Sequence, residues 1–183
     1  LDREALTLYF NFGYIPAPYS VYKGIKKLEA GSVLSLRAPF LEVETHKYWD
    51  VMQVAREGQN NIFKGTEAEA ADHLEYLLKE SIRQQMVADV PVGAFLSGGI
   101  DSTAVVTVMQ SLSSKKIRTF TIGLGEQAYN EAEFAKETAD YLGTEHTELY
   151  ISDKDAQAVI PKLAYIYGEP FADSSQIPTY LVS

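Results

Sequence analysis

The sequence predicts an α/β fold that contains three strands of a doubly wound parallel sheet, preceded by a short helix and a β-hairpin. Three observations support this prediction. From residue 66 onward, short apolar runs alternate with segments of helical periodicity, as in βαβ units. A glycine-containing turn at residues 97–103 follows the first of these runs and opens a helix. Before residue 50, two stretches alternate apolar and polar residues around a turn, which indicates an antiparallel hairpin.

The first 65 residues are expected to hold one helix, the hairpin and a linker. The helix covers residues 2–12 and is closed by Gly13, and the hairpin pairs 32–37 with 41–48 across a turn at Ala38-Pro39-Phe40. The polar stretch 51–65 contains Gly58, Asn60, Asn61 and Gly65. We therefore expect it to be a domain linker that is mobile or readily cleaved by proteases.

The remaining residues are expected to alternate between helices and strands. Thr66-Glu67-Ala68-Glu69 has the pattern of a capping box and should open a helix that ends near Asp89. The expected elements after it are, in order, a strand at 92–96, a helix at 103–112, a strand at 117–122, a helix at 130–142, a strand at 147–151, a helix at 153–167 interrupted at Pro161, and a last helix opening at 174–181.

Composition excludes several functional classes. The chain has 183 residues, 46% of them hydrophobic, which is enough to bury a core. Its net charge of −9 argues against nucleic-acid binding, which needs clustered cations. It has no cysteine, so disulfides, thiolate zinc sites and a cysteine nucleophile are excluded for these residues. No apolar run approaches the length that spans a bilayer, so we expect no membrane partner and a cytoplasmic location.

The segment with the clearest chemistry is Ser97-Gly98-Gly99-Ile100-Asp101-Ser102-Thr103, between an expected strand and its helix. Glycines in such a turn let the main chain approach phosphate oxygens, and a helix N-terminus presents N–H groups to an anion. Ser97, Ser102 and Thr103 add hydroxyl donors. Asp101 would repel phosphates unless it held a metal ion, so we interpret it as a Mg²⁺ ligand.

Three other glycine-loop motifs do not match this segment. A Walker loop needs Lys followed by Ser or Thr after the second glycine, and the dinucleotide fingerprint needs three spaced glycines. A serine-hydrolase elbow needs glycine two residues before the nucleophile, where this chain has Phe95. An ordinary glycine turn without a ligand is the remaining alternative.

The segment FLSGGIDST (95–103) resembles the pyrophosphate loop, Ser-Gly-Gly-x-Asp-Ser, of the ATP α-hydrolase ligases. Its surroundings resemble glutamine-hydrolysing asparagine synthetase in particular, at DVPVGAFLSGGIDST (89–103), TFTIGL (119–124), EPFADSSQIPTYL (169–181), FGYIPAPYSVYKGIKKLEAG (12–31) and YWD (48–50). The resemblance covers nearly the whole chain and implies an adenine nucleotide α-hydrolase-like fold. It implies that residues 1–50 are the tail of a glutaminase domain with the hairpin, and that 66–183 begin an ATP-dependent synthetase domain.

The resemblance also implies roles for individual residues. ATP and pyrophosphate are expected to bind at Leu96, Ser97, Gly98, Gly99, Asp101, Ser102, Thr103 and Ile122, with Mg²⁺ held by Asp101. Asp173, Ser174 and Ser175 correspond to positions near the substrate or nucleotide, and Glu169 is a weaker candidate. The alternative for Ser174 or Ser175 is the N-cap of the last helix.

The implied reaction is ATP-dependent amide formation. Aspartate and ATP would form β-aspartyl-AMP and pyrophosphate, and ammonia released from glutamine would convert that intermediate to asparagine and AMP. Another ligase with the same loop, such as a β-lactam synthetase, and a nucleotide-binding module without catalysis remain as alternatives. Within the family these would differ in the pocket for the acyl acceptor.

Two features of the family are expected outside these residues. The glutaminase domain should begin with a catalytic cysteine, and a second metal-binding stretch, Ser-Gly-Glu/Asp-Gly-x-Asp-Glu, would lie beyond Ser183. The chain is therefore expected to be a piece of a larger protein that forms no asparagine by itself. Its three strands should lie in the order 3-2-1, which leaves strand 1 at an open edge that favours self-association.

Overall fold

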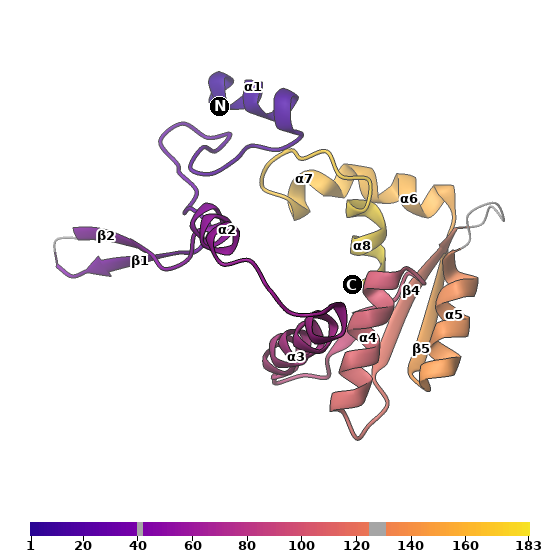
Figure 1. Ribbon diagram of the computed structural model, residues 1–183. Helices are drawn as coiled ribbons and strands as arrows, with labels where there is room; N and C mark the ends of the chain where they lie inside the picture. The colour runs from indigo at the N-terminus through magenta and orange to yellow at the C-terminus, as the bar shows by residue number, and fades with distance from the viewer. Residues whose placement is uncertain (40–41, 125–130) are drawn as a thin grey trace. The chain divides into compact units, whose positions relative to one another are not determined.

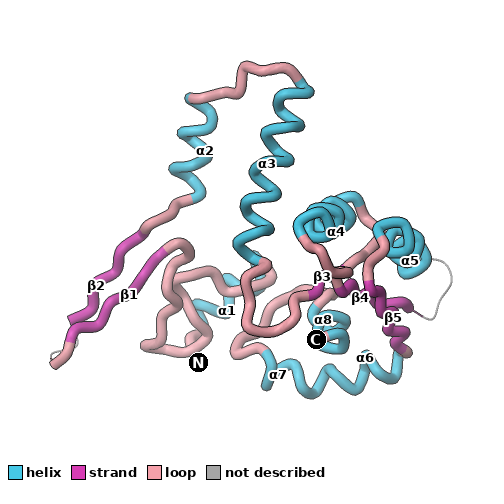
Figure 2. Tube along the Cα trace, turned by 90° about the horizontal axis from the view of Figure 1, so that it is seen from below, coloured by secondary structure: helices cyan, strands magenta, loops and turns pink. Residues whose placement is uncertain are grey.

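The computed structural model describes residues 1–39, 42–124 and 131–183, and the chain divides into two compact units. The first unit contains residues 1–64 and 161–174, and the second contains residues 65–160 and 175–183. Figures 1 and 2 show the helices and strands of both units. Each unit is therefore built from two separate stretches of sequence.

The first unit begins with helix α1 (Arg3–Phe12), which confirms the predicted helix. The Asp2 carboxylate caps its N-terminus by accepting hydrogen bonds from two first-turn amides at 3.0 and 3.3 Å. Gly13 ends the helix in the left-handed conformation, with φ +76°, and its amide donates to the Tyr9 carbonyl at 2.8 Å.

Residues 161–174, which include helix α7 (Leu163–Ile166), are held in the first unit by bonds to its N-terminal residues. The Ala172 amide donates to the Gly13 carbonyl at 2.6 Å. The Glu169 carboxylate accepts a hydrogen bond from the Val21 amide at 2.7 Å and forms an ion pair with Lys27. Val21 and Glu169 lie 148 positions apart in the sequence, so these bonds join distant parts of the chain.

The predicted hairpin is confirmed in its two strands. β1 (Ser32–Arg37) pairs with β2 (Glu42–Lys47) in antiparallel register, with Ser32 opposite Lys47. The predicted turn includes Phe40, which lies outside the described residues.

Helix α2 (Val51–Asn60) occupies most of the stretch that the sequence predicted as a linker. The Asp50 carboxylate starts it by accepting hydrogen bonds from the amides of Met52 and Gln53 at 2.9 and 3.0 Å. Asn60 is its last residue and Asn61 its C-cap, so the asparagines mark a helix end rather than a loop. The connection that remains between α2 and the next helix is much shorter than the predicted linker.

The second unit is an α/β structure with a three-stranded parallel sheet. Its elements are, in chain order, α3 (Glu67–Gln85), β3 (Gly93–Phe95), α4 (Ile100–Leu112), β4 (Arg118–Leu124), α5 (Glu131–Leu142), β5 (Glu145–Ile151), α6 (Asp153–Val159), the 3₁₀ turn η2 (Ile160–Lys162) at the junction of the two units, and α8 (Gln176–Val182). The strand order is β3-β4-β5, which confirms the predicted order and places β3 at an edge. Helices α4 and α5 cover one face of the sheet, and α6 and α8 lie on the other (Figure 2).

Several element boundaries in this unit differ from the prediction, among them three in or before the predicted loop. The capping box at Thr66 is present, but α3 ends at Gln85, before the predicted end at Asp89. β3 is shorter than the predicted strand. α4 begins at Ile100 rather than Thr103, because Gly99 adopts extended backbone angles and serves as the N-cap. The start of α4 therefore lies inside the predicted phosphate loop.

Two hydrophobic clusters of the second unit lie on the face of the sheet that α4 and α5 cover. Ile82, Val108, Met109 and Ile117 form one, and Leu96, Val106, Ala135 and Ala139 form the other. The second cluster fixes the start of the loop, since Leu96 is 1% exposed. Within the described ranges, no helix is long and apolar enough to cross a membrane.

A half-buried histidine is expected to make the second unit sensitive to acid. The Thr119 hydroxyl lies 2.9 Å from the Thr144 hydroxyl and 2.9 Å from Nδ1 of His146, while Nε2 of His146 is buried with no hydrogen-bond partner among the described residues. Burial holds the pKa of the His146 imidazole below its ordinary value of 6.5, against the opposing effect of Glu148 and Asp140.

We expect the unfolding temperature to fall as the pH drops below about 6.5. Below this pH, His146 is protonated in the unfolded chain but still neutral in the native state, so protonation favours unfolding. The free energy of unfolding therefore decreases as the pH falls toward the lower native pKa. The measurement is a series of thermal melts between pH 8 and pH 5 for wild type and His146→Gln, with exposed His73→Gln as the control. An equal acid dependence in all three proteins would contradict the assignment to His146.

Candidate nucleotide-binding site

The predicted phosphate loop leaves the sheet at the carboxyl end of β3. Leu96 directly follows this strand, and its amide donates to the Phe120 carbonyl of β4 at 2.8 Å. Ser97, Gly98 and Gly99 form the turn, and α4 begins at the next residue. The structure thus places the segment between a parallel strand and a helix N-terminus, the geometry that binds anions in many α/β proteins.

Gly98 is required at its position for two independent reasons. Its φ is +74°, a backbone conformation that residues with a side chain rarely adopt. A Cβ added there would lie 2.8 Å from Cβ of Phe134 and 3.1 Å from the Ala135 amide nitrogen, both in α5. The absence of a side chain therefore lets the loop lie directly against α5.

The Ser102 hydroxyl holds the turn in place. It accepts a hydrogen bond from the Ser97 amide at 3.2 Å, lies 2.9 Å from the Ser97 hydroxyl, and donates to the Gly99 carbonyl at 3.1 Å. Gly99 has no side chain to cap the first-turn amides of α4. The turn is thus held by hydrogen bonds, while the first-turn amides of α4 have no side-chain cap and can bind an external anion.

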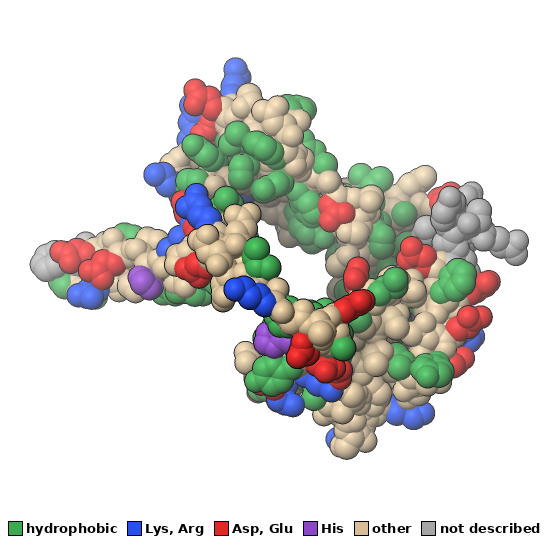
Figure 3. All heavy atoms as spheres, viewed as in Figure 1, with side chains coloured by type: hydrophobic (Ala, Val, Ile, Leu, Met, Phe, Trp, Pro, Cys, Tyr) green, Lys and Arg blue, Asp and Glu red, His purple; other side chains and the backbone are tan. Residues whose placement is uncertain are grey.

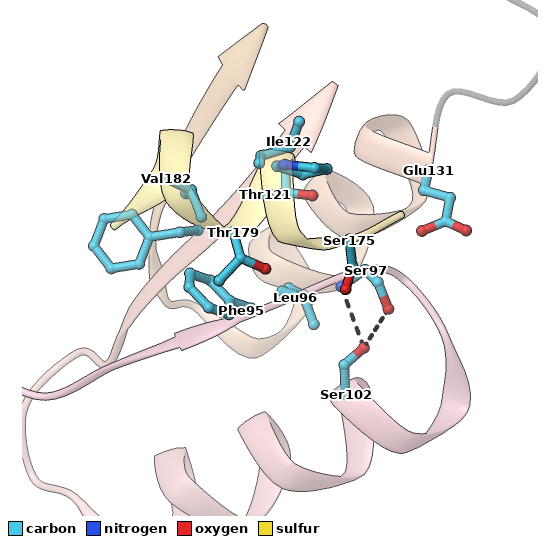
Figure 4. A pocket seen from close by; sticks show the side chains of 12 residues that line it. Phe95, Leu96, Ser97, Ser102, Thr121, Ile122, Glu131, Ser175, Thr179 and Val182 are labelled. Atoms are coloured by element: carbon cyan, nitrogen blue, oxygen red, sulfur yellow. Dashed lines mark hydrogen bonds between the residues drawn. The ribbon is translucent and has the colours of Figure 1, made fainter. Parts of the chain in front are cut away.

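A cavity of about 410 Å³ adjoins this loop. It lies at the carboxyl ends of β3 and β4 and is bounded by the starts of α4 and α5 and by α8 (Figure 4). Its lining residues are Phe95, Leu96, Ser97, Ser102, Phe120, Thr121, Ile122, Glu131, Ser175, Pro178, Thr179 and Val182. One end is largely apolar, with Phe95 and Val182, whereas Ser97, Ser102 and Ser175 gather at the other (Figure 4).

The structure brings most of the predicted residues together. Five of them line the cavity, namely Leu96, Ser97, Ser102, Ile122 and Ser175. Gly98, Gly99, Asp101 and Thr103 belong to the same loop and first helical turn without lining the cavity. Asp173 and Ser174 belong to the first compact unit, so the structure does not assign them to this site. Ser175 is the N-cap residue of α8, although its side chain does not make the capping hydrogen bond.

Sequence analysis missed several lining residues. Thr121 follows Phe120 on β4. Because ligands of parallel sheets bind at the carboxyl ends of the strands, its position late in this strand could have indicated it. Glu131 is the first residue of α5 and therefore also faces this edge of the sheet. Pro178, Thr179 and Val182 of α8 carried no local signal, because their place in the wall depends on how α8 packs on β4.

The donor groups at this site suit one kind of metal ion. Across the residues that the structure describes, no three or more His, Cys, Asp or Glu side chains are grouped so as to hold a metal ion. Mg²⁺ at nucleotide sites is usually bound by one or two carboxylates together with phosphate oxygens. Asp101, exposed on the first turn of α4, fits an ion that arrives with the nucleotide, but not an all-protein metal cage.

Comparison with known proteins agrees with this geometry. The sequence model of the asparagine synthase family matches residues 73–183, more than half of the chain, and this match includes the whole loop and every cavity residue. The chain belongs to the asparagine synthase family. The parallel sheet flanked by helices is consistent with the adenine nucleotide α-hydrolase-like fold of this family, as the sequence predicted.

Similar curated proteins cover the chain from end to end. It is 38% identical to "Putative asparagine synthetase [glutamine-hydrolyzing] 2" of Methanocaldococcus jannaschii over 186 residues, which cover 100% of this chain and 34% of that protein. It is 33% identical to "Asparagine synthetase [glutamine-hydrolyzing] 1" of Bacillus subtilis, covering 100% of this chain and 28% of that protein. A putative asparagine synthetase of Mycobacterium bovis is 31% identical, again over the whole chain and 27% of its own length. The chain thus spans about a third or less of these relatives.

Proposed function

We propose that this chain carries the ATP site of an asparagine-forming ligase, where ATP activates aspartate. The observation that supports it most directly is the Ser97–Ser102 turn, which presents a glycine backbone and an uncapped helix start beside the cavity. The names of its curated relatives support the choice of reaction. The partners proposed are aspartate, ammonia derived from glutamine, and a glutaminase domain, in the cytoplasm.

The two ends of the cavity suit the two ends of ATP. The apolar end, with Phe95, Ile122 and Val182, offers flat hydrophobic surface to the adenine base. The opposite end offers the hydroxyls of Ser97 and Ser102 and the N-terminal amides of α4 to the phosphates. In this orientation the bond between the α and β phosphates lies near the loop that would hold the departing pyrophosphate.

The proposed reaction has two steps. An oxygen of the aspartate side-chain carboxylate attacks the α phosphorus, the bond to the β phosphate breaks, and β-aspartyl-AMP and pyrophosphate form. Ammonia then attacks the acyl carbon, AMP leaves with the C–O electron pair, and asparagine forms with loss of a proton. The loop amides and hydroxyls stabilise charge that develops on the departing pyrophosphate. Mg²⁺, which Asp101 would hold, neutralises phosphate charge when it is bound.

The test measures exchange between pyrophosphate and ATP. In the enzyme that contains this chain, we expect exchange of labelled pyrophosphate into ATP that depends on aspartate and not on other carboxylic acids, and asparagine synthesis from ammonia as well as from glutamine. Exchange that requires a different carboxylate would instead favour another ligase with the same loop. Binding of ATP without any exchange would favour a nucleotide-binding module.

A further inference from the structure

The cavity beside the phosphate loop has an unexpected charge for a site that binds a polyanion. Among the described residues that line it, Glu131 is the only one with a charged side chain, and none is Lys, Arg or His. The others are aromatic, aliphatic or hydroxyl-bearing. A triphosphate that entered this cavity without a cation would meet only repulsion from a charged side chain.

The Glu131 side chain is exposed, and helix geometry determines the side of α5 from which it extends. Residues three and four apart share one face of a helix, so Glu131 lies on the same face of α5 as Phe134 and Ala135. Those two residues are the ones against which Gly98 packs, and Ala135 is fully buried. In Figure 4, Glu131 stands at the end of the cavity that also holds Ser97, Ser102 and Ser175. It therefore lies at the phosphate end rather than the base end.

Among the residues that the structure describes, none with a positive charge compensates the charge of Glu131. No ion pair of Glu131 is formed within the described residues, whereas Lys136 of the same helix pairs with Glu148 at 3.3 Å. Acidic side chains gather over α5 in Figure 3, where the helix carries Glu131, Glu133, Glu137 and Asp140. Because Glu131 alone among these acids lines the cavity, its carboxylate gives the phosphate end a negative potential that favours a cation there.

We propose that Glu131 makes this site selective for the cation-complexed nucleotide, by contacting the divalent cation bound to the phosphates or a water on that cation. This inference rests on the proposed ATP site and adds a second carboxylate, besides Asp101, that acts on the cation. The carboxylate attracts Mg²⁺·ATP and repels metal-free ATP. Its removal therefore changes the affinities for these two ligands in opposite directions, which neither a hydrogen bond to the ribose nor a structural role would do.

The experiment measures the dissociation constant of ATP for the 183-residue chain by titration calorimetry, once with excess Mg²⁺ and once with EDTA. The variants are Glu131→Gln, Glu131→Asp and Glu133→Gln. Glu133 is a matched control because it also lies in the first turn of α5, is exposed, and does not line the cavity. Thermal unfolding of each variant checks that the fold is intact.

We expect Glu131→Gln to weaken binding of Mg²⁺·ATP by about 10–100-fold, the usual cost of removing a group that supports a bound metal. Metal-free ATP should bind as tightly as to wild type or more tightly. The affinity of Glu131→Asp for Mg²⁺·ATP should fall between those of wild type and Glu131→Gln. Glu133→Gln should match wild type for both ligands.

Two results would overturn this role of Glu131 while leaving the ATP site standing. These are an equal loss of affinity for both ligands in Glu131→Gln, and unchanged affinity for both. If the wild-type chain bound neither form of ATP, the proposed function would fail, and this inference with it.

Discussion

Replacing Gly98 with valine is expected to abolish ATP binding and to destabilise the second unit. The left-handed backbone costs a residue with a side chain about 1–2 kcal/mol. The new side chain would also press on Phe134 and Ala135, since even a Cβ lies 2.8 Å from Cβ of Phe134. Overpacking of this kind costs about 1–3 kcal/mol when the neighbours must move. Relief of that contact would displace the loop from α5 and misplace its phosphate-binding amides.

Gly99 provides a matched control in the same turn. Its φ is −75°, and an added Cβ would meet only the Ser97 hydroxyl, at 3.3 Å. We therefore expect Gly99→Ala to change the unfolding temperature far less than Gly98→Val does. Calorimetric ATP titration and thermal melts of the two variants make the comparison. If Gly98→Val had the melting temperature and the ATP affinity of wild type, the close approach of Gly98 to α5 would not determine the position of the loop.

Asp101→Asn is expected to remove most pyrophosphate exchange while leaving the fold unchanged. Asp101 is exposed on the first turn of α4 and belongs to neither core cluster of this unit, so the neutral amide should fit without strain. A single group that stabilises developing charge contributes about 10²–10³-fold to the rate. The carboxylate that would hold Mg²⁺ beside the phosphates is such a group, and asparagine is a much poorer ligand for that ion.

The measurement for Asp101→Asn is the rate of aspartate-dependent pyrophosphate exchange as Mg²⁺ is titrated, with melting temperature as the check on folding. Asp72→Asn serves as the control, because Asp72 is an exposed acid on α3 outside the cavity lining. Partial recovery of exchange at high Mg²⁺ is expected for Asp101→Asn. Turnover close to wild type at ordinary Mg²⁺ would remove the metal assignment.

Local chemistry made the strand–turn–helix around residues 97–103 predictable. Two adjacent glycines, flanking serines and one aspartate between an apolar run and a helix specify a turn whose conformation depends mainly on its own residues. The strand order was predictable for a related reason, since parallel strands joined by short helical crossovers lie beside one another in sequence order. The capping signals at Asp2 and Thr66 likewise act within one helical turn.

Helix α2 shows where local composition misleads. Polar residues with Gly58, Asn60 and Asn61 are typical of loops, yet the Asp50 cap is enough to begin a helix that reaches Asn60. The position of residues 161–174 was also not predictable. It depends on bonds such as Ala172 to Gly13 and Glu169 to Val21, which join distant parts of the sequence.

The sequence by itself determined the loop at residues 97–103, the alternation of strands and helices, and the family, because each depends on neighbouring residues or on their order. Only the tertiary structure decided which side chains face that loop. Ser175 and Thr179 reach the cavity because α8 packs on the sheet, and Glu131 because α5 lies against Gly98. Such contacts arise from the burial of whole helix faces, a property of the assembled core that short segments of sequence do not carry.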